Sequence, residues 1–285
     1  MNKNIAALQK EPNGTIRLTV TIPSSDVKKT WEEVFADAVK NIEVPGFRKG
    51  KAPRNLTEGK IDKEKIREEV LKKLLPIAYT QAIKTHGIKP IINPKIHVEK
   101  LEDPSTSSGQ VRDWQFTALT CEAPIVNLNN YKDNIKSLTA KAKIVIPGKD
   151  KQEVKFEEIV KALLESVKAE IPTILIDNET DRLLSQTLED VKKLGLTLDQ
   201  YLSSTGKKPE DLRAEYRAKA ENDIKLEFAL LKIAEEEKIV VEEKEINEAI
   251  LAAKTEDEKK NLEANRYLLA SILRQQKTLD FLKNL

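Results

Sequence analysis

The spacing of apolar residues changes along the chain, and this change limits the folds that the chain can adopt. In residues 15–22, TIRLTVTI, apolar and polar residues alternate strictly. A period of two predicts a half-buried strand. From Lys155 to the C-terminus the apolar residues recur every three or four positions, which predicts helices. We therefore expect a mixed α+β region followed by an all-α region.

Residues 1–126 predict a small α+β domain. Helices are expected at about 27–42 and 62–87, and Pro76 is expected to kink the second one. The segments KIHVEKL (95–101) and VRDWQFTALTC (111–121) are typical of a hairpin. Together with the first strand they indicate a small antiparallel sheet with two helices on one face and a loop between the helices.

The rest of the chain predicts a connector and a helical domain. Residues 127–154 carry few apolar side chains and indicate an extended connector, with a short strand at 142–146. Residues 155–285 form the helical domain, with Thr197 and Thr255 opening two of its helices through capping boxes. Helices are expected at 155–167, 173–194, 197–202, 209–237, 242–253 and 255–285. The longest of these exceed what one small core can cover, so we expect protruding helical arms.

The loop between the two N-terminal helices has an unusual composition, EVPGFRKGKAP at 43–53. Its glycines and prolines exclude a helix or a central strand. Residues 40–54 contain five cations and one acidic residue, Glu43. Residues 1–103 as a whole carry 20 Lys and Arg against 14 Asp and Glu, a net charge of +6. A basic loop attracts phosphate, and Phe47 can enter an apolar pocket or stack on a base, so the loop suits a surface of RNA and protein.

Several stretches resemble one known family. GFRKGKAP, residues 46–53, is similar to the G-F-R-x-G-x-x-P ribosome-binding signature of bacterial trigger factor. The segments at 68–96 and 116–126, EEVLKKLLPIAYTQAIKTHGIKPIINPKI and FTALTCEAPIV, resemble that family's N-terminal domain. The segment VKAEIPTILIDNETDRLL, 167–184, is similar to the start of its helical C-terminal domain. The resemblance covers roughly residues 1–126 and 155–285.

The resemblance implies an ATP-independent chaperone. It implies docking beside the exit tunnel of the large ribosomal subunit, against protein and rRNA, and shielding of nascent or unfolded polypeptides in the cytoplasm. The ribosome-binding residues that it implies are Gly46, Phe47, Arg48, Lys49, Gly50, Lys51 and Pro53. Whether the free protein forms a homodimer stays open.

One departure from the family concerns prolyl isomerase activity. Most trigger factors insert an FKBP-like isomerase domain between the two regions, whereas here only residues 127–154 separate them. So short a segment cannot enclose a substrate pocket. We therefore expect a variant without the isomerase domain and without enzymatic activity.

The last predicted helix offers a candidate client surface. An apolar stripe runs through Leu262, Leu269, Ile272, Leu273, Leu279 and Leu282. Tyr267, Leu268, Phe281 and Leu285 fall outside this stripe, so the apolar surface is wider than one core face needs. Two interpretations stay open, a helix packed on two sides and a partly exposed surface for clients.

The sequence offers little for catalysis or metal binding. The single cysteine, Cys121, sits in an alternating strand and is expected to be a core residue. Two histidines, His86 and His97, without a second cysteine do not make a zinc site. Gly46 to Lys51 resembles a P-loop only loosely, since the spacing is one residue short and Ala52 stands where magnesium needs Ser or Thr. We expect no catalytic residues, no metal and no cofactor.

Two further expectations follow from the composition. No run of about 18 apolar residues occurs, and the first residues lack the apolar core of a signal peptide, so no membrane partner is expected. The competing function is an RNA-binding or ribosome-assembly module that uses the same basic loop without holding clients. Suppression of client aggregation separates the two, because an RNA module has no reason to show it.

Overall fold

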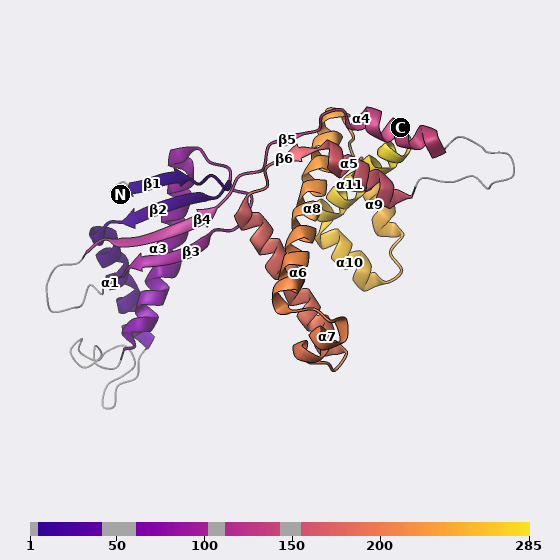
Figure 1. Cartoon of the computed structure of the whole chain (residues 1–285). Coiled ribbons are helices and arrows are strands. Elements are labelled where there is room, and N and C mark those ends of the chain that lie inside the picture. Colours follow the sequence, from indigo (N-terminus) through magenta and orange to yellow (C-terminus); the bar gives the residue numbers. More distant parts are fainter. Residues whose placement is uncertain (1–4, 42–60, 102–111, 143–154) are drawn as a thin grey trace, which may run out of the picture. The chain divides into compact units, whose positions relative to one another are not determined.

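The computed structural model describes residues 5–41, 61–101, 112–142 and 155–285. These residues form two compact units, divided between Ala123 and Pro124 (Figure 1). The N-terminal unit combines a four-stranded sheet with helices, and the C-terminal unit is mainly helical. The expected α+β domain is therefore present, and the expected helical domain is present with a short two-stranded sheet added.

The N-terminal unit is built on an antiparallel sheet in the order β1-β2-β4-β3. Its strands are β1 (Ile5–Lys10), β2 (Ile16–Ile22), β3 (Lys95–Lys100) and β4 (Trp114–Thr120). The alternation in β2 corresponds to a half-buried strand, as predicted, because Leu18 and Val20 have no exposed surface and their polar neighbours are partly exposed. Strand β1 was not predicted, since IAALQK lacks a clear alternation; it is an edge strand paired along its length with β2.

Two helices pack on the sheet, α1 (Ser24–Asn41) and α3 (Lys63–His86). Asp62 accepts hydrogen bonds at the N-terminus of α3, and Gly87 ends the helix at φ 63°, a left-handed conformation that glycine adopts without strain. Helix α3 continues through Pro76 as one helix. The helix buries Ile66, Val70, Ala78 and Ala82, whereas Ile77 beside Pro76 is 54% exposed.

The C-terminal unit consists of eight described helices and a two-stranded sheet. The helices are α4 (Tyr131–Ala142), α5 (Phe156–Ser166), α6 (Thr173–Lys193), α7 (Leu198–Thr205), α8 (Pro209–Glu236), α9 (Glu243–Leu251), α10 (Glu256–Ala264) and α11 (Arg266–Lys283), and the strands are β5 (Val126–Asn127) and β6 (Lys168–Ala169). The capping boxes at Thr197 and Thr255 form as predicted, and Pro209 opens α8. Sequence periodicity thus located most of these helices.

The connector prediction for residues 127–154 is wrong where the structure describes them. Residues 131–142 form α4, and Val126–Asn127 pairs with Lys168–Ala169. Tyr131, Ile135 and Thr139 recur every four residues and are all buried, a helical period that the intervening polar residues obscure. Of the strand expected at 142–146, Ala142 lies in α4 and the remainder falls outside the described residues.

The last predicted helix is two helices. The helix that Thr255 caps ends at Ala264, and a new one begins at Arg266. Between them Asn265 has φ −116° and ψ 34°, outside the helical region. The Asn265 amide donates to the carbonyl and to the side-chain oxygen of Asn261, so its own side chain competes with the helical pattern.

Helix α8 organises the core of the C-terminal unit. Its C-terminal half buries Leu230 and Ile233 in one cluster with α4, α5 and α11. Its middle buries Ala220 and Ile224 in a second cluster with Ile176 of α6. A third cluster joins α9 and α11. Because each cluster is small, many apolar side chains of the unit stay at its surface.

Candidate functional site

The predicted ribosome-binding residues lie outside the residues that the structure describes. They are Gly46, Phe47, Arg48, Lys49, Gly50, Lys51 and Pro53. The elements on either side are described: α1 ends at Asn41, and α3 begins after its cap Asp62. Phe35 of α1 and Ile66 of α3 belong to the same core cluster. The segment that contains the loop is therefore attached at both ends to packed helices.

One cation counted with the loop already has a partner. Lys40 Nζ lies 2.8 Å from the Oδ1 atom of Asp37 in the last turns of α1. The hydrogen bond and the charge of Lys40 lower the pKa of the Asp37 carboxyl. Lys40 therefore adds less positive potential beside the loop than its formal charge suggests.

The four predicted client-binding residues divide into two groups. Tyr267 and Leu268 are 90% and 58% exposed at the start of α11. Phe281 and Leu285 are partly buried and pack against the cluster that contains Leu282. Only the first pair presents apolar surface to solvent as a client site requires.

The face of α11 that is buried changes along the helix. Near its start Leu269 packs with Ile246 and Ile250 of α9, and near its end Leu282 packs with α5 and α8. The helix is thus packed on two sides in different parts, and the first half leaves a separate face open. Ile272, which the stripe placed in the core, is 50% exposed and lies one turn after Leu268. We call Tyr267, Leu268 and Ile272 the α11 patch.

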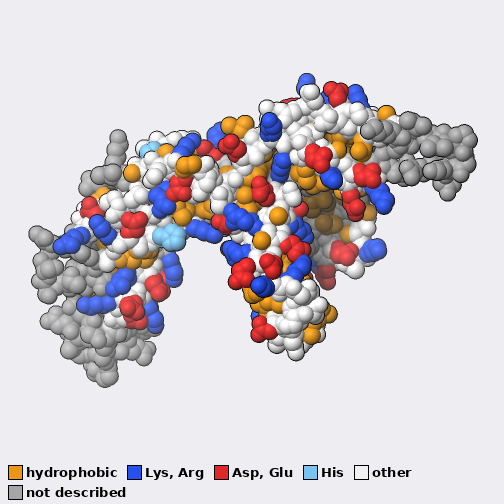
Figure 2. All heavy atoms as spheres, in the orientation of Figure 1, with side chains coloured by type: hydrophobic (Ala, Val, Ile, Leu, Met, Phe, Trp, Pro, Cys, Tyr) orange, Lys and Arg blue, Asp and Glu red, His pale blue; other side chains and the backbone are white. Residues whose placement is uncertain are grey.

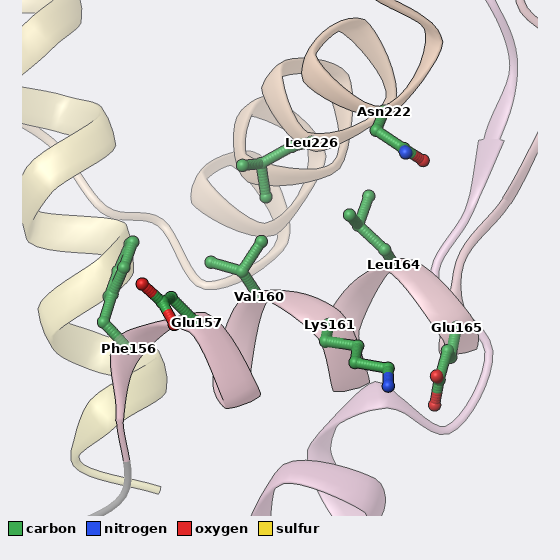
Figure 3. Close-up of a pocket in the computed structure, with 8 residues that line it drawn as sticks. All are labelled: Phe156, Glu157, Val160, Lys161, Leu164, Glu165, Asn222 and Leu226. Carbon is green, nitrogen blue, oxygen red and sulfur yellow. The ribbon is translucent and has the colours of Figure 1, made fainter. Parts of the chain in front are cut away.

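A groove between α5 and α8 forms a second apolar surface (Figure 3). Its volume is about 490 Å³. One wall carries the apolar side chains of α5 at successive turns, and the other belongs to α8. The lining residues are Phe156, Glu157, Val160, Lys161, Leu164, Glu165, Asn222 and Leu226. Val160, Leu164 and Leu226 point toward one another across the groove, and charged side chains lie along its outer side.

Sequence reasoning missed this groove although α5 carries a signal for it. Ile159 and Leu163 form a buried ridge, so one face of α5 is fully used by the core. Phe156, Val160 and Leu164 form a second ridge at the same spacing of four, and Phe156 is 52% exposed. A helix with two apolar ridges and one core needs a second covering surface or leaves one ridge open. Lys225 Nζ donates to the carbonyl of Leu164 at 2.7 Å, which fixes α8 against this ridge.

A third exposed apolar surface lies around the junction of α6 and α7. Four leucines there are exposed, Leu188, Leu194, Leu196 and Leu198, and the largest exposed fraction is the 75% of Leu194. Figure 2 shows hydrophobic side chains at the surface around α7. No sequence argument singled out these leucines, because isolated exposed leucines are common and only their clustering in space is informative.

The residues weighed for catalysis have ordinary structural roles. Cys121 is fully buried, and burial raises the pKa of its thiol to about 11. His97 is exposed on β3, and His86 Nε2 lies 3.0 Å from the carbonyl of Ala6 at the end of α3. Within the described ranges no group of His, Cys, Asp and Glu is arranged to hold a metal ion. Nor does any described helix combine the length and the apolar character that crossing a membrane requires.

Comparison with protein families gives two matches that together span the chain. The N-terminal model of "Bacterial trigger factor protein (TF)" matches residues 4–159, and the model of its C-terminus matches residues 129–284. The two matches overlap over α4 and the start of α5. The match of the C-terminal model, which begins at residue 129, agrees with the packing of α4 into the C-terminal unit.

Individual relatives and a solved structure are also similar to the chain. "Trigger factor" of Staphylococcus aureus strains JH9 and Newman is 36% identical over 127 residues, which are 45% of this chain and 28% of those proteins. The chain thus matches less than a third of the length of these relatives. A solved structure described as "Promiscuous Substrate Recognition in Folding and Assembly Activities of the Trigger Factor Chaperone" superimposes with a TM-score of 0.64 at 14% identity, covering 98% of this chain and 99% of that one. This likeness shows a shared fold.

Proposed function

Because the chain belongs to the bacterial trigger factor family, we propose that it is an ATP-independent chaperone that docks at the ribosomal exit tunnel and shields nascent polypeptides. The observation that carries this proposal is the exposed apolar surface of the C-terminal unit. The α11 patch, the α5–α8 groove and the leucines near α7 are three separate surfaces of this kind. The proposed clients are unfolded polypeptides with apolar segments.

The form of these surfaces suits holding and release. Each one offers a few apolar side chains without a deep enclosed pocket, so a single contact binds weakly. Several such contacts on one extended chain add up through their high effective concentration, and each can dissociate by itself. Mixed charges border the groove, Glu157 and Glu165 beside Lys161, so no single sign of charge is required of a client.

For the ribosome we propose the loop residues 46–53 as the docking element. The motif GFRKGKAP supports this, since it matches the family signature in a segment attached to α1 and α3. Arg48 and Lys49 would supply attraction to phosphate that weakens with salt, and Phe47 would supply an apolar contact that does not.

Co-sedimentation with ribosomes tests the docking element. We expect the triple variant F47A/R48A/K49A to lose binding while its circular dichroism spectrum stays unchanged. The matched control is K28A/K29A, which removes two exposed cations from α1 outside the loop. Undiminished ribosome binding by the folded loop variant would contradict the assignment of the loop. An equal loss of binding in the control would show that positive charge in general, and not the loop, attracts the ribosome.

We also propose that the chain lacks prolyl isomerase activity. Residues 127–154 stand where the family inserts the isomerase domain, and α4 occupies 131–142 of them and packs its buried face into the core. In a protease-coupled proline-peptide assay, cis/trans isomerisation should proceed at its uncatalysed rate, with a time constant of roughly tens to hundreds of seconds near 25 °C. Acceleration by pure protein would overturn this proposal.

A further inference from the structure

Helices α6 and α8 lie side by side and antiparallel, with α7 at their far end (Figure 1). Two ion pairs define the register of the helices, Asp177 with Arg217 and Asp181 with Arg213. A step of four residues forward on α6 corresponds to a step of four residues back on α8, as antiparallel helices require. The contacts that hold the pair together differ along its length.

Apolar packing holds the pair at its two ends. At the inner end Ile176 packs with Ala220 and Ile224, and these three are buried. At the outer end Val191 of α6, Leu202 of α7 and Leu212 of α8 are buried. Each end therefore contributes apolar burial, which salt at moderate concentration does not screen.

Between these ends the contact is mixed: Leu183 of α6 is partly buried against the inner cluster, and the cross-helix contacts around it are polar. Residues 181–190 of α6 and 213–219 of α8 are all described, and none of their side chains is fully buried. Arg213 Nη2 lies 3.2 Å from the Oδ1 atom of Asp181, and both side chains are more than half exposed. The hydroxyls of Thr187 and Tyr216 are 2.7 Å apart. Figure 2 shows charged side chains of both signs along this helix pair.

We infer that residues 181–190 of α6 form a latch that ionic strength opens. Exposed ion pairs weaken as salt shortens the Debye length from about 10 Å at 0.1 M to about 3 Å at 1 M. A helical stretch this short is marginal once it leaves its neighbour, so release from α8 makes its backbone hydrogen bonds open more often. Helix α8 continues unbroken past the latch and keeps its own packing toward Ile233.

The latch bears on the exposed leucines near α7. Leu188 lies within the latch, and Leu194, Leu196 and Leu198 follow it directly along the chain. Opening of the latch changes the spacing between these side chains and α8. Local ionic strength, or a polyanion near Arg213 and Arg217, would thus set how rigidly this apolar surface is presented. The inference does not depend on client binding, and its test needs no client.

Hydrogen exchange measured by mass spectrometry on the full chain tests the latch. Between 0.05 M and 1 M NaCl we expect exchange in peptides covering 184–190 to rise about three- to tenfold, the scale of losing one or two exposed ion pairs. Peptides from residues 222–233 of α8 should not change. An unchanged rate at 184–190, or an equal rise in both regions, contradicts the latch.

Two variants separate the cross-helix pairs from a general effect of salt. D181L/R213M keeps side-chain bulk and net charge but removes the pair, so its exchange at 184–190 should lose most of its salt response. K193M removes a cation that pairs within α6, with Asp190 at 3.1 Å, and should keep the full response. If D181L/R213M is as salt-sensitive as the wild type while folded, the ion pair does not form the latch.

Discussion

Tyr131 donates a hydrogen bond to the Oε1 atom of Glu237 at 3.2 Å and so joins the start of α4 to the end of α8. Lys132 Nζ lies 2.6 Å from the same oxygen. Nearby, the amides of Asn129 and Asn134 each donate to Ser166 at 2.7 Å. Residues 124–142 are therefore part of the helical unit and are not a flexible connection to it.

The first prediction concerns the boundary of this unit. A fragment 124–285 should unfold in one cooperative transition, whereas 155–285 should be much less stable, because it loses buried Leu128, Tyr131 and Ile135. In the full chain, I135A should lower the unfolding free energy of the helical unit by about 2–4 kcal/mol. Urea denaturation followed by circular dichroism measures both. Equal stability of the two fragments would show that α4 is dispensable.

The second prediction uses the pH dependence of Tyr131. Burial, followed by the nearby charge of Glu237, raises the pKa of the Tyr131 phenol. The unfolded chain ionises near pH 10, so the stability that the neutral phenol retains in the fold is lost as pH rises above about 10. Y131F should cost about 1 kcal/mol at pH 7, through the lost hydrogen bond, and should lose less stability than the wild type above pH 10.

Tyr267 provides the matched control, since it is 90% exposed. Melting curves of Y267F should follow the wild type across the whole pH range. If Y131F and the wild type lose stability in parallel between pH 9 and 11, the phenol is not held neutral by the fold.

The third prediction concerns a carboxyl on α8. Partial burial raises the pKa of Glu227, and the charge of Glu179 on α6 raises it further. A raised pKa means that stability is present below the unfolded value and is lost as pH rises through the folded one. E227Q should therefore raise the melting temperature at pH 7, by about 1–2 °C because much of the side chain is exposed, and should match the wild type below about pH 4.

E221Q on the same helix is the control, because it removes the same charge from an exposed side chain. A gain at pH 7 in E221Q equal to that in E227Q would assign the effect to net charge.

The sequence predicted the elements that depend on local chemistry. Alternation located β2, and the capping boxes of Thr197 and Thr255 located helix starts, because these signals act over a few residues. Sequence-based prediction was wrong where contacts between distant segments determine the local structure. Helix α4 is stabilised by contacts with α8 more than 90 residues later, and its period was masked by polar residues.

The candidate surfaces show the same division. The width of the apolar face left the exposure of Tyr267 and Leu268 as one of two interpretations, and the partial burial of Phe281 depends on the cluster around Leu282. The α5–α8 groove requires two helices that are distant in sequence, so no pattern within α5 could define its second wall.

The central claim is that exposed apolar side chains of the C-terminal unit hold unfolded chains. Its most direct measurement is suppression of aggregation of a denatured client by the full chain carrying F156S, Y267S and L268S. All three side chains are at least half exposed, so the melting temperature should stay within about 2 °C of the wild type. The control I77S/I91S/V98S removes three exposed apolar side chains from the N-terminal unit. The account predicts that the first variant protects the client poorly and that the control protects it fully; full protection by a normally melting F156S/Y267S/L268S protein would contradict the account.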